Sequence, residues 1–127
     1  MKYMLLTYLD EKAWLALSPE EQAREMSQCA PHIEALLKTK KLIAGAPLYP
    51  TSSATTIRYR DGKRLLTDGP FAETREQLGG YTLIDADNLD DAIAIASGFC
   101  GTSTLATIEV RPIVELGGPV KSVPDAS

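Results

Sequence analysis

The chain has 127 residues, of which 44% are hydrophobic and 24% are charged, and its formal net charge is -4. These values are typical of one soluble globular domain and argue against a disordered or fibrous chain. The lack of a basic excess argues against direct nucleic-acid binding, and no stretch approaches the roughly 18 apolar residues of a membrane span, so we expect a cytoplasmic protein.

The first predicted element is a strand from Lys2 to Leu9, which carries bulky side chains on both of its alternating faces. A strand of this kind is covered on both sides. The following segment, Asp10 to Leu17, is expected to be a loop or short turn. It contains the only tryptophan, Trp14, which we interpret as a packing residue.

A long helix is predicted from Ser18 to about Lys40. Ser18 can cap this helix, Pro19 suits its first position, and Glu21 can complete a capping box. Apolar residues then recur at spacings of three and four and form one stripe: Ala23, Met26, Ala30, Ile33 and Leu37. Pro31 predicts a kink or two abutting helices, because an interior proline removes a hydrogen bond and costs about 3 kcal/mol.

The middle of the chain predicts a short strand and a hairpin. The strand covers Leu42 to Ala46, and the hairpin strands are Thr55 to Arg60 and Lys63 to Thr67. Asp61-Gly62 between them is the usual signal for a two-residue type I′ turn. This register places three pairs opposite each other: Tyr59 and Arg64, Ile57 and Leu66, and Thr55 and Asp68.

The second half predicts another strand, helix and strand. The strand covers Gly80 to Asp85, Asn88 caps the helix, and Gly98 or Gly101 ends it. The last strand, from Thr104 to Val114, alternates with a period of two. One face holds Ala106, Ile108, Val110 and Val114, and the other holds Leu105, Thr107, Glu109 and Arg111. The tail, residues 117–127, should be loosely ordered.

This order of elements gives two split βαβ halves with an inserted β-hairpin, an α+β fold of the ferredoxin-like kind over residues 1–116. Two helices can cover only one face of its sheet, whereas the first strand is apolar on both faces. The simplest cover for the second face is another copy of the chain. We therefore predict a homodimer whose sheets face each other around a partly open cavity.

The densest unusual chemistry lies in the segment TDGPFAETREQLGGYTL, residues 67–83. Asp68 directly precedes Gly69-Pro70, a pair that predicts a rigid corner holding a carboxylate. In a poorly hydrated pocket Asp68 could act as a general base. The alternative is that it caps the turn by accepting backbone N–H groups around Phe71. The charged residues Glu73, Arg75 and Glu76 are expected to form a solvated short helix.

Several segments resemble the DGPF-domain group of the YCII-related family over nearly the whole chain: MKYMLL, SPEE, LIAGAPL, DGPFAETREQLGGY, DADNLDDAIAIA and IEVRP. The resemblance implies a dimeric α+β barrel, usually of unassigned function. Some relatives are encoded with or fused to extracytoplasmic-function sigma factors, which implies a sigma factor as a partner. The family is noted for a His and Asp pair in a cleft. Asp68 matches the acid, but the family histidine falls near Cys29, one helical turn before His32.

His32 is the only histidine, so it is the only side chain with an ordinary pKa near neutrality. On an unbroken helix it points roughly 140° away from the apolar stripe, at about 100° per residue, which favours a surface position. Only a kink at Pro31 would bring it into the cleft. Cys29 and Cys100 lie far apart without a CxxC motif or Cys/His ligand spacing. We expect plain buried thiols and no metal site.

Glu109 and Arg111 share the polar face of the last strand, about 7 Å apart. Inside a dimer they would suit an anionic or enolate-like ligand, whereas on an open surface they would be an ordinary exposed pair.

Two functions compete at this point. The first is a cofactor-free small-molecule protein that performs proton-transfer chemistry, with the catalytic residues Asp68 and His32 and the substrate-binding residues Arg111, Glu109, Tyr81, Phe71 and Tyr3. The second is a non-catalytic interaction or sensing module linked to transcriptional regulation.

Overall fold

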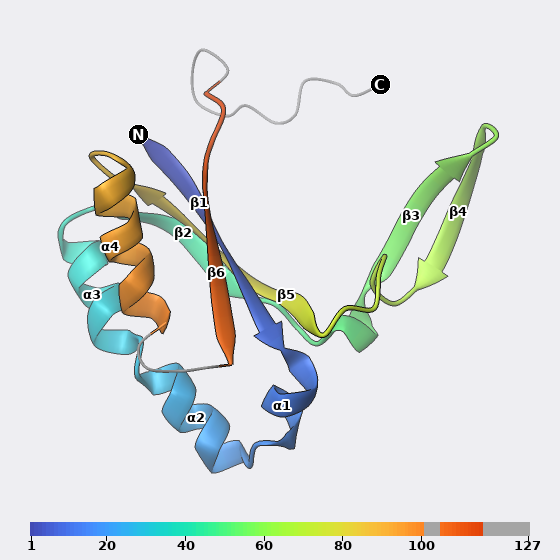
Figure 1. Cartoon of the computed structure of the whole chain (residues 1–127), viewed down its shortest axis with the longest axis horizontal. Coiled ribbons are helices and arrows are strands. Elements are labelled where there is room, and N and C mark those ends of the chain that lie inside the picture. Colours follow the sequence, from blue (N-terminus) through green and yellow to red (C-terminus); the bar gives the residue numbers. More distant parts are fainter. Residues whose placement is uncertain (101–104, 116–127) are drawn as a thin grey trace.

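Four antiparallel strands form the central sheet in the order β2-β5-β1-β6 (Figure 1). The strands are β1 (Lys2–Asp10), β2 (Leu42–Pro47), β5 (Glu76–Asp85) and β6 (Ala106–Pro112). The computed structural model describes residues 1–100 and 105–115, so the predicted tail and the helix end at Gly101 lie outside the described residues. With helices between β1 and β2 and between β5 and β6, the order confirms the ferredoxin-like α+β fold. Each edge strand ends on a proline, Pro47 in β2 and Pro112 in β6.

The segment between β1 and β2 forms α1 (Glu11–Ala16), α2 (Pro19–Ser27) and α3 (Ala30–Lys38). The capping box that opens α2 is present: Ser18 Oγ accepts from the Glu21 N–H at 3.1 Å, and the Glu21 carboxylate accepts from the Ser18 N–H at 3.0 Å. The predicted long helix is two helices, with Pro31 in the first turn of α3.

The expectation of a loop from Asp10 to Leu17 was wrong, because α1 occupies most of it. Asp10 Oδ1 accepts a hydrogen bond from the Ala13 N–H at 3.1 Å and caps this short helix. Among the helices of the described residues, none combines the length and apolar character needed to cross a membrane.

One face of the sheet packs against α3 and α4 (Leu89–Cys100), which Figure 1 shows on the same side. The buried core lies between them and consists of Tyr3, Leu5, Leu36, Ile84, Ala86, Ala92, Ile95 and Ala96. Side chains alternate along a strand, so the even-numbered residues of β1 point to the other face. Cross-strand pairing defines the members of this open face: Met4, Leu6, Tyr8, Leu78, Tyr81, Leu83, Thr107, Glu109 and Arg111.

The hairpin of β3 (Thr55–Arg60) and β4 (Lys63–Asp68) forms a separate two-stranded sheet. Its register pairs the residues that the sequence predicts, including Thr55 with Asp68. Asp61 and Gly62 have φ values of 53° and 74°, as a type I′ turn requires at both central residues. Figure 1 shows the hairpin projecting from the body on the side of the sheet away from α3 and α4.

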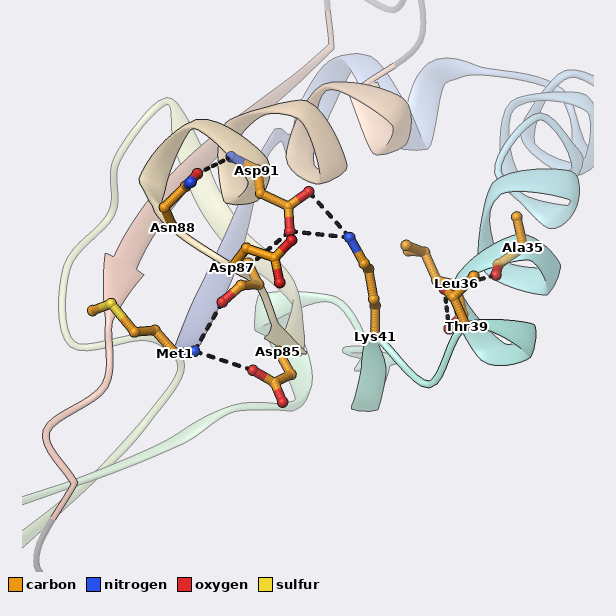
Figure 2. A network of polar contacts seen from close by, with 10 residues as sticks. Met1, Ala35, Leu36, Thr39, Lys41, Asp85, Asp87, Asn88 and Asp91 are labelled. Atoms are coloured by element: carbon orange, nitrogen blue, oxygen red, sulfur yellow. Dashed lines mark hydrogen bonds and ion pairs between the residues drawn. The ribbon is translucent and has the colours of Figure 1, made fainter.

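A network of polar contacts joins β5, α4 and the start of β2 (Figure 2). The Lys41 ammonium donates to both carboxylate oxygens of Asp91, at 3.0 and 3.2 Å. Asp91 also accepts from the Asp87 N–H at 2.9 Å, while its own N–H donates to the Asn88 side chain, which confirms Asn88 as the helix cap. The hydrogen bonds from Asp87 and Lys41 lower the pKa of Asp91, and the bond to Asp91 raises the pKa of Lys41.

Candidate functional site

A hollow of about 970 Å³ lies where the open face meets α1 and the segment that follows the hairpin. Three kinds of segment contribute to it: the end of β1 with α1, the start of β6, and the run from Phe71 to Leu78. The lining residues are Tyr8, Asp10, Ala13, Phe71, Ala72, Thr74, Arg75, Glu76, Gln77, Leu78, Leu105 and Thr107. Much of the predicted DGPF segment therefore forms one wall of a cavity.

The wall from Phe71 to Leu78 is held by its own polar side chains. The Gln77 amide donates to the backbone carbonyls of Ala72 and Thr74, at 3.0 and 3.3 Å. From the hairpin, the Arg58 guanidinium donates to the Phe71 carbonyl at 3.0 Å. These bonds fix the backbone at Phe71 and in the residues that follow it, while the Phe71 side chain is 75% exposed beside the hollow.

The polar lining contains carboxylates that already have partners. Asp10 forms an ion pair with Arg75 at 3.4 Å, although the Arg75 side chain remains 89% exposed. Glu76 accepts a hydrogen bond from the Thr107 hydroxyl at 3.0 Å across the hollow. Because Arg75 carries five donor N–H groups, most of its hydrogen-bonding capacity remains directed to solvent or to a ligand.

A second polar group lies next to the hollow on the open face. Glu109 forms an ion pair with Arg111 at 2.8 Å and accepts from the Tyr8 hydroxyl at 3.4 Å. The bond and the charge of Glu109 raise the pKa of the Arg111 guanidinium. Tyr8 belongs both to this group and to the lining of the hollow, so the two are continuous.

Four of the residues predicted for the site lie on or beside the open face. Glu109, Arg111 and Tyr81 are on the open face itself, and Phe71 lines the hollow. Tyr81 is 37% exposed, opposite Leu6 of β1.

Tyr3 lies elsewhere. It is only 3% exposed, and its ring is in the core on the helix-covered side of the sheet. Tyr8, on the other face of the same strand, is the tyrosine that reaches the hollow. The assignment of Tyr3 to a pocket is therefore corrected.

Asp68 is exposed at the end of β4 and is absent from the lining of the hollow. The corner itself forms as predicted, with Gly69 at a φ of 101° and its N–H donating to the Ala54 carbonyl at 2.7 Å. Among the described residues, no hydrogen bond to the Asp68 carboxylate is found, so the alternative in which it caps the turn near Phe71 is not observed either.

The expectation that His32 faces water was wrong. Its Nε2 lies 2.7 Å from the Ile95 carbonyl oxygen, and its ring packs edge-on against Phe99 with the centroids 4.8 Å apart. The helix is interrupted between α2 and α3. The direction expected for His32 on one continuous helix therefore does not apply. His32 fastens α3 to α4 on the helix-covered side, away from the open face.

Sequence reasoning missed Tyr8, Asp10 and Thr107, and it interpreted Arg75 and Glu76 as parts of a solvated helix. Glu76 instead begins β5, and both residues line the hollow. The sequence signal that could have indicated this site is the spacing of Tyr8 and Asp10, which places both side chains on the same face of the first strand. Within residues 1–100 and 105–115, no group of three or more potential ligands is arranged to hold a metal ion.

Comparison with known proteins finds related sequences over most of the chain. Residues 1–117 match the family of the YCII-related domain. The chain is also similar to an uncharacterized protein of Rhizobium meliloti (strain 1021), with 39% identity over 114 residues that cover 89% of this chain and 92% of that protein.

Proposed function

The chain belongs to the YCII-related domain family, and from this premise we propose that it binds a small organic acid in the hollow beside Phe71. The observation that carries the proposal is the combination of an exposed aromatic ring with an exposed guanidinium on one wall, Phe71 and Arg75. A ring of this kind packs against the hydrocarbon part of a ligand, and a guanidinium binds a carboxylate with paired hydrogen bonds.

The apolar members of the lining support the same ligand class. Ala13, Leu78 and Leu105 give the hollow hydrocarbon walls beside its charged groups. Sites for small molecules are usually of this mixed kind, with few polar groups that fix orientation. Arg111 on the adjoining part of the open face offers a second cation, since its side chain is 64% exposed despite its bond to Glu109.

A homodimer is part of the proposal. The open face carries apolar side chains such as Met4, Leu6 and Leu83, and a surface of this kind in a soluble protein is usually an interface. A second copy seated on the open face would shield these side chains and enclose the hollow. Enclosure would strengthen the charged contacts to a ligand, because it lowers the local dielectric constant.

For cofactor-free proton transfer at this site, Glu76 replaces Asp68 as the candidate base. Glu76 lines the hollow and accepts a single side-chain hydrogen bond from Thr107. Asp10 and Glu109, by contrast, are each paired with a guanidinium. A base must lie within hydrogen-bond reach of the proton that it removes, and Asp68 lies outside the lining.

A thermal-shift screen of small aromatic and aliphatic carboxylic acids tests the binding proposal. A compound that binds should raise the Tm of the wild type, and Phe71→Ala and Arg75→Gln should each abolish most of that rise. Asp68→Asn is the matched control, because it alters an exposed acid in the same segment outside the hollow. Loss of binding in Asp68→Asn alone, or no stabilisation by any acid, would overturn the proposal.

A further inference from the structure

The two faces of the hairpin differ in chemistry. The apolar hairpin face carries Ile57, Tyr59 and Leu66, whose side chains are 59%, 75% and 57% exposed, together with one cation, Arg64, which pairs with Tyr59 near the turn. Strand alternation places the cations Arg58, Arg60 and Lys63 on the opposite face. The hairpin is therefore amphipathic, and the large apolar side chains of this face are left exposed by the part of the chain that the structure describes.

Side chains of the basic face join the hairpin to the segment that follows it. Thr56 donates its hydroxyl hydrogen to the Gly69 carbonyl at 2.8 Å, and Arg58 donates to the Phe71 carbonyl at 3.0 Å. Both side chains lie on the face opposite Ile57 and Tyr59. These bonds hold the base of the hairpin against the wall of the hollow and leave the apolar hairpin face turned outward.

An uncovered hairpin of this composition needs a partner. A two-stranded hairpin alone is marginally stable in water, and exposed clusters of large apolar side chains mark interaction surfaces. Figure 1 shows the hairpin projecting on the side of the open face. A second copy that covers the open face would therefore lie beside the hairpin, within the reach of about 20 Å that six-residue strands provide.

The charge distribution favours a second copy as that partner. Residues 55–68 contain four cations and two anions, for a net charge of +2. Because the whole chain has a net charge of -4, the remaining residues together carry -6. Two such bodies repel each other, whereas the hairpin of one attracts the body of the other. A chain with this distribution is complementary to itself.

We propose that the hairpin is a clasp: each copy packs its apolar hairpin face against the body of the second copy in the dimer. This inference rests on the homodimer of the proposed function and adds the element that fastens it. In the assembly the hairpins cross from one copy to the other, and each remains anchored at its base beside the hollow of its own chain.

Adjacent leucines on opposite faces of β4 provide the test. Leu66→Glu places a charge on the apolar hairpin face, while Leu65→Glu places the same charge on the basic face. Both side chains are largely exposed, at 57% and 44%, and circular dichroism checks that both variants fold. In sedimentation equilibrium, Leu66→Glu should weaken the dimer at least tenfold and Leu65→Glu less than threefold.

Photo-crosslinking shows whether the hairpin touches the second copy. A benzophenone side chain at position 59 should crosslink between isotopically distinct copies, and the same group at position 60 on the basic face should do so far less. A wild type that stays monomeric would overturn both the dimer and the clasp. A dimer that Leu66→Glu leaves intact, equal weakening by both glutamates, or no intermolecular crosslink from position 59 would overturn the clasp alone.

Discussion

A methyl group added at Gly98 would clash with the ring of His32, so the histidine fills the space that a side chain on α4 would need. The ring is held there by the contact of its Nε2 with the Ile95 carbonyl and by Phe99. This contact between α3 and α4 therefore depends on a glycine in one helix and a histidine in the other.

Gly98→Ala should lower the free energy of unfolding by about 1–3 kcal/mol, the usual cost of overpacking. The ring of His32 would have to move and lose its contact with Ile95. In a His32→Ala background the same substitution should instead stabilise the protein by about 0.5–1 kcal/mol, because alanine is the better helix former. Urea unfolding of the four variants measures this reversal of sign. If Gly98→Ala has the same effect in both backgrounds, the close contact does not control the helix pair.

Ser18→Ala should cost about 1 kcal/mol of stability, because it removes the side chain that caps α2 and leaves the Glu21 N–H without its partner. The pKa of Glu21 is held below its ordinary value by hydrogen bonds from the Ser18 backbone N–H and, to a smaller extent, from the Ser18 side chain. Loss of the side chain should therefore raise this pKa only part of the way. Chemical denaturation gives the first quantity and NMR titration of the carboxyl group gives the second. Ser18→Thr keeps the cap and should reproduce the wild type; a Ser18→Ala variant of unchanged stability would show that the cap is dispensable.

The contribution of Asp91 to stability should depend on pH. Its pKa is lowered in the folded chain, so its stabilisation is present above the ordinary value near 3.8 and is lost as the pH falls through the lowered pKa. Lys41 has a raised pKa, so the pair should also weaken as the pH rises above 10.5 through the raised value. The gap in unfolding free energy between wild type and Asp91→Asn should thus be widest near neutrality and close in acid.

Asp90→Asn is the control for this measurement. It removes a charge of the same sign from the same helical turn, but Asp90 makes no ion pair in the part of the chain that the structure describes. At neutral pH, the difference in unfolding free energy between wild type and Asp90→Asn should be smaller than that between wild type and Asp91→Asn. Equal gaps for the two variants at every pH would show that the contact with Lys41 is irrelevant.

Glu76→Gln should separate ligand binding from proton transfer. The amide keeps the shape of the side chain and its contact with Thr107, so an acid found in the thermal-shift screen should bind with an affinity within about threefold of wild type. If Glu76 is the base, exchange of the ligand α-hydrogen for deuterium, followed by NMR, should slow at least 100-fold, in line with the usual 10²–10⁴-fold contribution of a general base. Exchange at the wild-type rate would exclude Glu76 from this role.

The sequence predicted those parts of the fold that local chemistry controls. The Asp61-Gly62 turn sets the register of the hairpin, and Ser18 with Glu21 sets the start of α2. The alternating pattern of β6 was also correct from Ala106 to Arg111, because one face packs on the core and the other does not. In each case the deciding contacts join residues close in sequence or follow a clear period.

The candidate site was harder to predict because it depends on contacts that sequence patterns do not reveal. The first strand is apolar on both faces, so its pattern could not tell that Tyr3 enters the core while Tyr8 reaches the hollow. The position of His32 depends on the break between two helices that a continuous period would hide. The course of the chain around Arg75 depends on bonds from the Gln77 side chain to backbone carbonyls.

The prolines that end β2 and β6 affect how the protein behaves at high concentration. Strands at the margins of a sheet can recruit further strands and seed fibrils, and a residue without an N–H hinders that growth. Pro47 and Pro112 place this obstacle on both margins. Replacing both prolines by alanine should allow the edge strands to pair with strands of other molecules, and amyloid dyes would detect the resulting aggregates.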